Sequence, residues 1–391
     1  MKDGSSSIRA GTDPVAVGSR TIELSGFGYT GQSEWSIDAN GSWSAADYAK
    51  WDNAGGTPGM DGAASVADTA LFGSAATAAR TITLDGNNPG VSTLTFNNGT
   101  WGYTIAQGSG GTLTVGNATN AGTITNTAGN HTISAPITLG SNITMSSSEG
   151  SLLQISGVVA GESKNITKTG TGGLELSGGG NFGTLTISEG TLVINGTQTT
   201  TTTGTTIASG ATLAGAGTLA GGTTISGTHS PGNSPDVQTF NDGLTYTTGA
   251  SIVWELIDNT VAGRGTNYDG IDVTGDLTFS GSTTVNLDFA LGTSAVDWTD
   301  AFWDISYTGT SGWKLFDVTG QISGFEELQL AYTGIDGQAQ TLTSIRSSAS
   351  FSLYQDGTGI YLNYTSAIPE PSTALAGMLL AAGILRRRRR A

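Results

Sequence analysis

The chain has 391 residues, of which only 12% are charged, and it contains 61 glycines and no cysteine. The formal net charge of −16 disfavours binding to the phosphate backbone of a nucleic acid. The lack of cysteine excludes disulfides, cysteine nucleophiles and thiolate metal sites, and the glycine content indicates short strands and tight turns rather than a helical enzyme domain.

The first segment, residues 1–35, is expected to be poorly ordered. Met1 to Arg20 carries Lys2 and Arg9 but lacks the apolar run of about 7–15 residues that a signal peptide needs. We interpret Met1 as a misplaced start that has lost a leader, because the opposite end of the chain has the features of an export signal. The alternative is a protein that is not exported.

Residues 36–110 form the next region, rich in tryptophan and glycine and predicted to be all-β. Its clearest strand is 91–96, which lies between the turn signals at 85–87 and 97–99. Side chains alternate between the two faces of a strand, so Ser92, Leu94 and Phe96 share the more apolar face. We predict that this face is buried.

Residues 111–257 repeat short units of glycine, threonine and one apolar side chain. A unit of this kind cannot bury itself, whereas stacked units can. We therefore predict a parallel β-helix, or β-solenoid, with three short strands in each coil and with threonines and asparagines stacked in ladders. The side chains expected to point inward recur at six-residue intervals: Ile207, Leu213, Leu219 and Ile225.

Two segments of this region, 166–178 and 183–192, resemble the autotransporter-associated β-strand repeat. They carry that family's order of lysine, two glycines, an apolar residue, Leu-Ser-Gly, and then Gly-Thr-Leu. Ser230 to Pro235 is similar to the turn that follows such repeats. The resemblance implies, for residues 111–257, a parallel β-helix like that of passenger domains.

Residues 258–366 regain aromatic side chains and are predicted to form an additional all-β C-terminal region. Tryptophans here and in the N-terminal region lie in apolar, strand-like surroundings, so we expect them in the core. The alternative is a role in stacking on sugar rings. These tryptophans are Trp43, Trp51, Trp298, Trp303 and Trp313.

We predict that the chain is not an enzyme and that it has no catalytic residue, metal site or cofactor. A polysaccharide lyase needs a cation and a base, yet Lys164 and Lys168 are the sole cationic side chains of residues 111–257. A hydrolase needs two facing carboxylates. The spacing of the glutamates instead indicates solvent-facing turns, at Glu149, Glu162, Glu175 and Glu189.

Two further groups of polar side chains are candidate ligands. His131 and His229 are each isolated, and we expect both in turns or at the surface rather than in a metal site. Asp269, Asp272 and Asp276 could supply oxygen ligands to Ca²⁺, but they do not follow a known calcium-loop spacing. We expect these carboxylates to be solvated in a loop.

Residues 367–391 form a tail with three parts. Pro369 and Pro371 keep the motif around Glu370 extended. An apolar segment to Leu385 follows, and residues 372–385 are expected to form a short transmembrane helix, although the 12 apolar residues span only about 18 Å. The alternative is a soluble amphipathic helix. Arginines that orient the helix by the positive-inside rule end the tail: Arg386, Arg387, Arg388, Arg389 and Arg390.

This tail resembles the PEP-CTERM sorting signal of Gram-negative, biofilm-forming bacteria. The resemblance covers Pro369-Glu370-Pro371, the apolar segment and Arg386–Arg390, in that order. It implies processing by exosortase, a membrane enzyme that recognises the Pro-Glu-Pro motif. It also implies that the precursor is held transiently in the inner membrane until this processing, and that the mature protein then reaches the cell surface or the extracellular matrix.

We therefore expect a non-catalytic exported protein with a structural or adhesive role, and with exopolysaccharide as a candidate partner. The alternatives are a carbohydrate-binding surface protein and a glycan-active β-helix enzyme. An exposed row of aromatic side chains would favour binding of sugars, and a groove with paired carboxylates would favour catalysis. A surface of threonine and asparagine would favour the structural role.

Overall fold

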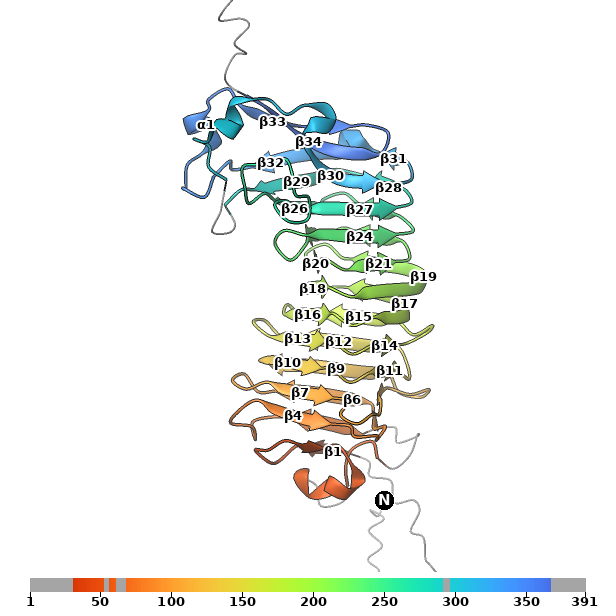
Figure 1. Ribbon diagram of the computed structural model, residues 1–391. Coiled ribbons are helices and arrows are strands. Elements are labelled where there is room, and N and C mark those ends of the chain that lie inside the picture. Colours follow the sequence, from red (N-terminus) through yellow and green to blue (C-terminus); the bar gives the residue numbers. More distant parts are fainter. Residues whose placement is uncertain (1–30, 53–55, 61–67, 291–295, 367–391) are drawn as a thin grey trace, which may run out of the picture.

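The protein is described by a computed structural model at residues 31–52, 56–60, 68–290 and 296–366. Within these ranges the chain is all-β with long parallel sheets, and its helical segments are short turns. Figure 1 shows the chain winding in successive coils along one axis, from β1 (Gln32–Glu34) at one end to the hairpin of β33 (Ser350–Gln355) and β34 (Gly359–Thr365) at the other. This winding is consistent with the predicted β-solenoid.

A coil of the central region contains three strands, one on each of three faces. In one coil these are β9 (Gly122–Ala128), β10 (Asn130–Ile133) and β11 (Ile137–Leu139). The next strand, β12 (Ile143–Ser147), pairs in parallel with β9, so the chain has returned to the first face one coil further along. The three-stranded coil that the repeat predicts is therefore present.

One face is a 12-stranded parallel sheet. Its strands are β2 (Gly41–Ser42), β4 (Arg80–Thr83), β7 (Tyr103–Ala106), β10, β13 (Leu152–Ile155), β16 (Gly173–Leu176), β18 (Thr191–Ile194), β20 (Thr212–Gly215), β23 (Thr228–Pro231), β26 (Ser251–Glu255), β29 (Thr283–Asp288) and β32 (Leu328–Tyr332).

The other two faces belong to one 22-stranded sheet, because β17 (Gly180–Ile187) and β19 (Thr197–Ile207) each turn the corner between them. The first of these faces contains β1, β3 (Thr69–Phe72), β6 (Thr93–Asn97), β9, β12, β15 (Ile166–Thr169), β17, β19, β22 (Thr223–Ile225), β25 (Leu244–Tyr246), β28 (Leu277–Phe279) and β31 (Ile322–Ser323). The second contains β5 (Gly90–Val91), β8 (Leu113–Val115), β11, β14 (Val159–Ala160), β17, β19, β21 (Thr218–Ala220), β24 (Val237–Asn241), β27 (Gly270–Thr274), β30 (Trp313–Val318), β34 and β33.

The core consists of the inward side chains of all three faces. Ile207, Leu213, Leu219 and Ile225 are each at most 1% exposed, which confirms the predicted inward set. They come from β19, β20, β21 and β22 in turn, so the six-residue interval is the advance from one face to the next. After three such steps Ile225 lies in register with Ile207 on the adjacent coil.

The predicted strand 91–96 is divided in the structure. Leu94 and Phe96 are buried as expected, but Ser92 is only half-buried and Val91 is buried, at 2% exposure. Val91 belongs to β5 and Thr93 begins β6, so a corner of the coil separates them. The alternation rule applies within one straight strand, and the corner resets which residues face inward.

Aromatic side chains cover the N-terminal end of the stack. Trp35 and Trp43 both pack against Trp51, with ring centroids 5.4 and 5.2 Å apart. The short 3-10 helix η1 (Ala45–Lys50) lies beside β2. Residues 31–35, which we expected in a poorly ordered segment, thus contribute β1 and a buried tryptophan to this end.

The C-terminal end is closed by antiparallel pairing. β34 pairs antiparallel with both β30 and β33, which ends the parallel stacking. Trp298, Trp303 and Trp313 pack against Phe351 of this hairpin, and the ring centroids of Trp298 and Trp303 lie 4.6 Å apart. The remaining helical segments lie in this region: η2 (Ala301–Asp304), η3 (Gly309–Ser311), η4 (Phe325–Glu327) and α1 (Leu342–Ile345).

The parallel stacking passes through two of the expected domain limits, at residues 110/111 and 257/258. β8 pairs with β5 across the first limit, and β27 pairs with β24 across the second. None of the helices in the described ranges has the length and apolar character needed to cross a membrane. The expected transmembrane helix at 372–385 lies outside the described residues.

Candidate functional site

A single file of threonines runs along the outer surface of the face that contains β9 and β12. In these strands apolar side chains alternate with threonine, so the apolar ones point into the core and the threonines point outward. Strand pairing places each threonine next to its counterpart one coil away. We call this file the threonine ladder: Thr69, Thr93, Thr123, Thr144, Thr167, Thr186, Thr206, Thr224, Thr245 and Thr278.

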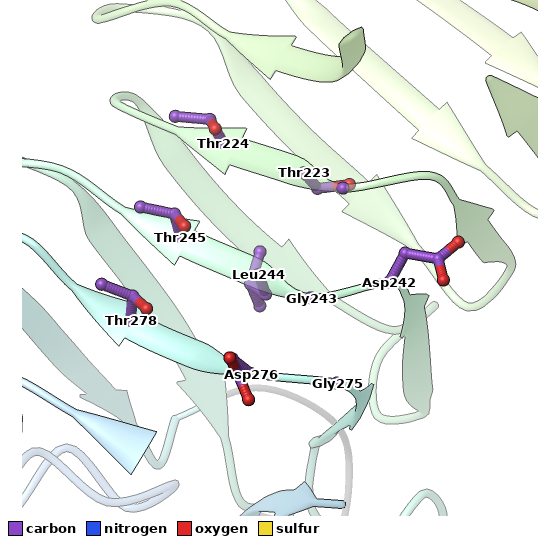
Figure 2. A pocket seen from close by; sticks show the side chains of 10 residues that line it. Thr223, Thr224, Asp242, Gly243, Leu244, Thr245, Gly275, Asp276 and Thr278 are labelled. Atoms are coloured by element: carbon purple, nitrogen blue, oxygen red, sulfur yellow. The ribbon is translucent and has the colours of Figure 1, made fainter. Parts of the chain in front are cut away.

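The threonine ladder keeps its register over its whole length. The hydroxyl of Thr123 donates to that of Thr93 at 3.0 Å. At the far end Ser323 pairs with Thr278, and its hydroxyl donates to the Thr278 hydroxyl at 3.2 Å. Figure 2 shows Thr224, Thr245 and Thr278 with their side chains directed the same way from successive strands.

A second file of small side chains lies beside the threonine ladder, two residues further along each strand. Strand pairs and backbone hydrogen bonds between coils keep these residues in register. Beside Thr69 the file begins with Leu71, which pairs with Thr95. The members that follow are either hydroxyl-bearing or alanine, and none is ionisable: Thr95, Thr125, Ser146, Thr169, Ser188, Ala208, Ser226, Thr247 and Ser280. The two files together form a strip without charge on a protein whose formal net charge is −16.

A hollow of about 510 Å³ opens at the corner beside the C-terminal half of the threonine ladder. Thr224, Thr245 and Thr278 line one side, and Asp242 and Asp276 lie at the other, as Figure 2 shows. Asp242 Oδ2 accepts a hydrogen bond from the Gly221 amide at 3.2 Å, and Asp276 Oδ1 accepts one from the Gln321 amide at 2.8 Å. Backbone groups thus hold both carboxylates at the corner.

The three candidate calcium ligands have separate partners. Asp272 forms a salt bridge with Arg264 at 2.7 Å, and Asp276 lies at the hollow. Asp269 is fully buried, so the expectation of loop solvation is wrong for this residue. Its two oxygens accept hydrogen bonds from the amides of Asp236 and Glu255, and burial raises the pKa of Asp269 to about 8.

Across the described ranges of the chain, there is no group of three or more His, Asp or Glu side chains arranged to hold a metal ion. Glu149, Glu162 and Glu189 are exposed, as predicted for turns. Glu175 instead lies on β16, where its carboxylate accepts hydrogen bonds from Gln154 at 3.0 Å and Asn195 at 3.1 Å. It therefore belongs to a polar row that joins neighbouring coils.

The surface positions expected for the two histidines are wrong. His131 is buried and stacks on Phe96, and its Nδ1 accepts a hydrogen bond from the Tyr103 amide. His229 is fully buried, with Tyr246 donating to Nδ1 at 2.6 Å and Nε2 donating to Gln238 Oε1 at 2.8 Å. Burial lowers the pKa of His131 and lowers that of His229 to about 4.

Sequence reasoning also missed a buried lysine. Lys168 is fully buried, and its Nζ donates to the carbonyl oxygens of Thr169 (2.9 Å), Gly170 (2.6 Å) and Glu189 (3.1 Å). Burial lowers the pKa of Lys168 to about 8. The sequence does contain an indication of this burial. Lys168 lies two residues after Ile166, so the alternation of side chains along a strand assigns both residues to the inward face.

The core assignment of the tryptophans is confirmed. Trp43, Trp298, Trp303 and Trp313 are fully buried, and Trp51 is 3% exposed. These side chains are therefore not available to stack on sugar rings. The predicted processing motif, Pro369-Glu370-Pro371, and the orienting arginines Arg386 to Arg390 lie outside the described residues. No protein-family model matches the sequence, and no curated protein matches it.

Proposed function

We propose that the chain is a non-catalytic exported protein of the cell surface or extracellular matrix, with a structural or adhesive role. The observation that carries the proposal is the threonine ladder, which presents one uncharged hydroxyl on each coil from Thr69 to Thr278. Many equivalent groups on one rigid body let contacts that are individually weak act together. This is the property that an adhesive or matrix protein requires.

Two further features support a structural role. Aromatic clusters cover both ends of the stack, around Trp51 and around Trp303, and so close the apolar core of the solenoid at its ends. An apolar cluster runs through the core along the whole stack, from Trp35 to Tyr364, with buried polar side chains such as Lys168 and His229 interspersed along it. A rod built in this way displays a long surface without needing a cleft.

The proposal also draws on two resemblances in the sequence, one in the repeat and one in the C-terminal tail. The repeat at residues 166–192 resembles the autotransporter-associated β-strand repeat, and the tail resembles a PEP-CTERM signal. We place the precursor in the inner membrane of a Gram-negative bacterium with Arg386–Arg390 inward, and we expect exosortase to cut near Pro369-Glu370-Pro371. Exopolysaccharide is the proposed partner of the mature protein in the matrix.

Cell fractionation and intact mass measurement in an exosortase-bearing host test this proposal. Wild-type protein should reach the surface without Arg386–Arg390. Glu370→Ala should leave the protein in the membrane and uncut, because the apolar segment is intact. Replacing all five arginines by serine should disturb retention and orientation while leaving the motif readable. Surface protein that still carries Arg386–Arg390 would show that the tail is a permanent anchor and not a sorting signal.

A further inference from the structure

The threonine ladder has a fixed two-dimensional spacing. Adjacent strands of a sheet lie about 4.8 Å apart, and alternate residues of one strand lie about 6.6 Å apart. The ladder and the second file beside it therefore form a grid of hydroxyl and methyl groups at these two spacings. Pairing holds Thr144, Thr167 and Thr186 in register without a shift, and the same is true of Thr224, Thr245 and Thr278.

The chemistry of this grid restricts what it binds. With no charge in either file, it offers nothing that would select an ion, a phosphate or a charged glycan. It contains no aromatic side chain, the group that most often stacks on the faces of sugar rings. What remains is a regular, rigid surface of alternating hydrogen-bonding and apolar groups.

The buried hydroxyls of Thr205 and Thr223 do not belong to this surface. They pair with each other on adjacent coils and alternate with Thr206 and Thr224 of the ladder, so they face the core. The hydroxyls that this face presents to the outside are those of the outward threonines.

We propose that the threonine ladder binds the surface of ice. In the surface planes of hexagonal ice, water oxygens repeat at a spacing close to the separation of adjacent strands. Waters held between the rows of hydroxyl and methyl groups would take up that repeat and join the lattice. Each coil adds one more equivalent contact, so affinity grows with the length of the ladder. This inference rests on the proposed adhesive role, and it identifies ice as the surface to which the protein adheres.

The test uses the purified full-length protein and measures the fraction that enters slowly growing ice, together with the size of ice grains after annealing. Wild type should enter the ice and keep the grains small. The double variant Thr167→Lys, Thr186→Lys places two charges in adjacent coils of the ladder. Its ice-bound fraction should fall by roughly tenfold or more, because the bulky cations hold neighbouring coils away from the lattice.

The matched control is Thr81→Lys, Thr104→Lys, which changes two paired outward threonines on the 12-stranded sheet. The control should bind ice as the wild type does, and circular dichroism should show that both variants are folded. Wild type that stays in the liquid overturns the proposal, as does equal loss in both variants. Wild type that dimerises through the ladder, or that sediments with cellulose or chitin but not with ice, also overturns it. Surface delivery is measured separately on cells, so either proposal can fail alone.

Discussion

The buried Nζ of Lys168 lies 3.1 Å from the carbonyl oxygen of Glu189, which belongs to the following coil. The same ammonium group donates to the carbonyls of Thr169 and Gly170 in its own coil, so one side chain joins two successive turns. An ammonium has three donors, and all three are used here. Lys168 therefore links neighbouring coils at a corner of the solenoid.

Replacing Lys168 by methionine tests this link. Methionine fills a similar volume but leaves three carbonyl oxygens without the ammonium donor, which should lower the free energy of unfolding by about 1–3 kcal/mol. Denaturant titration measures the change. The control is Lys164→Met, in the preceding turn, which should stay within about 0.5 kcal/mol of the wild type. Equal midpoints for the two variants would contradict the linking role.

The pH dependence of stability should report His229. Burial lowers its pKa from 6.5 to about 4, so the unfolded chain binds a proton between these values while the folded chain does not. His229 therefore lowers stability by up to about 3 kcal/mol as the pH drops from 6.5 to about 4, and it contributes no change above 6.5. Buried Asp269, whose pKa is raised to about 8, acts in the opposite direction across this window, so the contribution of His229 is read from a comparison with a variant that lacks it. Thermal or urea unfolding across this window measures the slope.

The variant His229→Phe separates this effect from the titration of carboxylates. It loses the hydrogen bonds with Tyr246 and Gln238 and should be less stable than the wild type at neutral pH. Compared with the wild type, its stability should nevertheless fall less, or rise more, as the pH drops from 6.5 to 4, since the imidazole that titrates is gone. The slope that remains comes from His131, whose pKa burial lowers, and from Asp269, which acts in the opposite direction. An unchanged slope would argue against a neutral, buried His229.

Substitution of the leucines in the repeat should destabilise the protein far more than substitution of its glutamate. Leu185 and Leu192 are fully buried, whereas Glu189 is exposed in the turn between their strands. Leu185→Asp or Leu192→Asp places an unpaired charge in the core and should cost more than about 3 kcal/mol. Glu189→Ala should cost less than about 0.5 kcal/mol. Similar melting shifts for the two kinds of variant would refute this assignment.

Much of the fold could be predicted because apolar residues identify the inward positions directly. Ile207 and Ile225 are examples, since each lies alone among glycine and threonine. Polar inward residues were assigned by residue type rather than by position in the strand. This is why His131 and Lys168, which alternate with Ile133 and Ile166, were not predicted to be buried.

The threonine ladder was predicted only in general terms. Pairing depends on the length of each coil, and this length varies: Thr224 pairs with Thr245, but the next partner of Thr245 is Thr278. Longer connections in the C-terminal coils separate threonines that lie side by side in space. Without the register of each coil, the sequence does not reveal which threonines share a file.

A last prediction concerns the corner at Gly190, close to Lys168. Gly190 has a φ of 70°, and a Cβ there would press on the carbonyl oxygens of Gly170 and Gly172 in the preceding coil. Gly190→Ala should therefore combine backbone strain of about 1–2 kcal/mol with a steric clash that pushes the coils apart. The expected result is a clear fall in melting temperature.

Two other glycines separate these contributions. Gly210 has a φ of 85° but open space around a Cβ, so Gly210→Ala should show the strain alone. Gly357 also has open space and no such φ, so Gly357→Ala should leave stability unchanged or raise it by about 0.5 kcal/mol. Gly357→Ala should have the highest melting temperature of the three variants, Gly210→Ala a lower one, and Gly190→Ala the lowest. If Gly190→Ala and Gly210→Ala have the same melting temperature, the neighbouring coil shifts to accommodate the added methyl group. Close packing at this corner would then not limit stability.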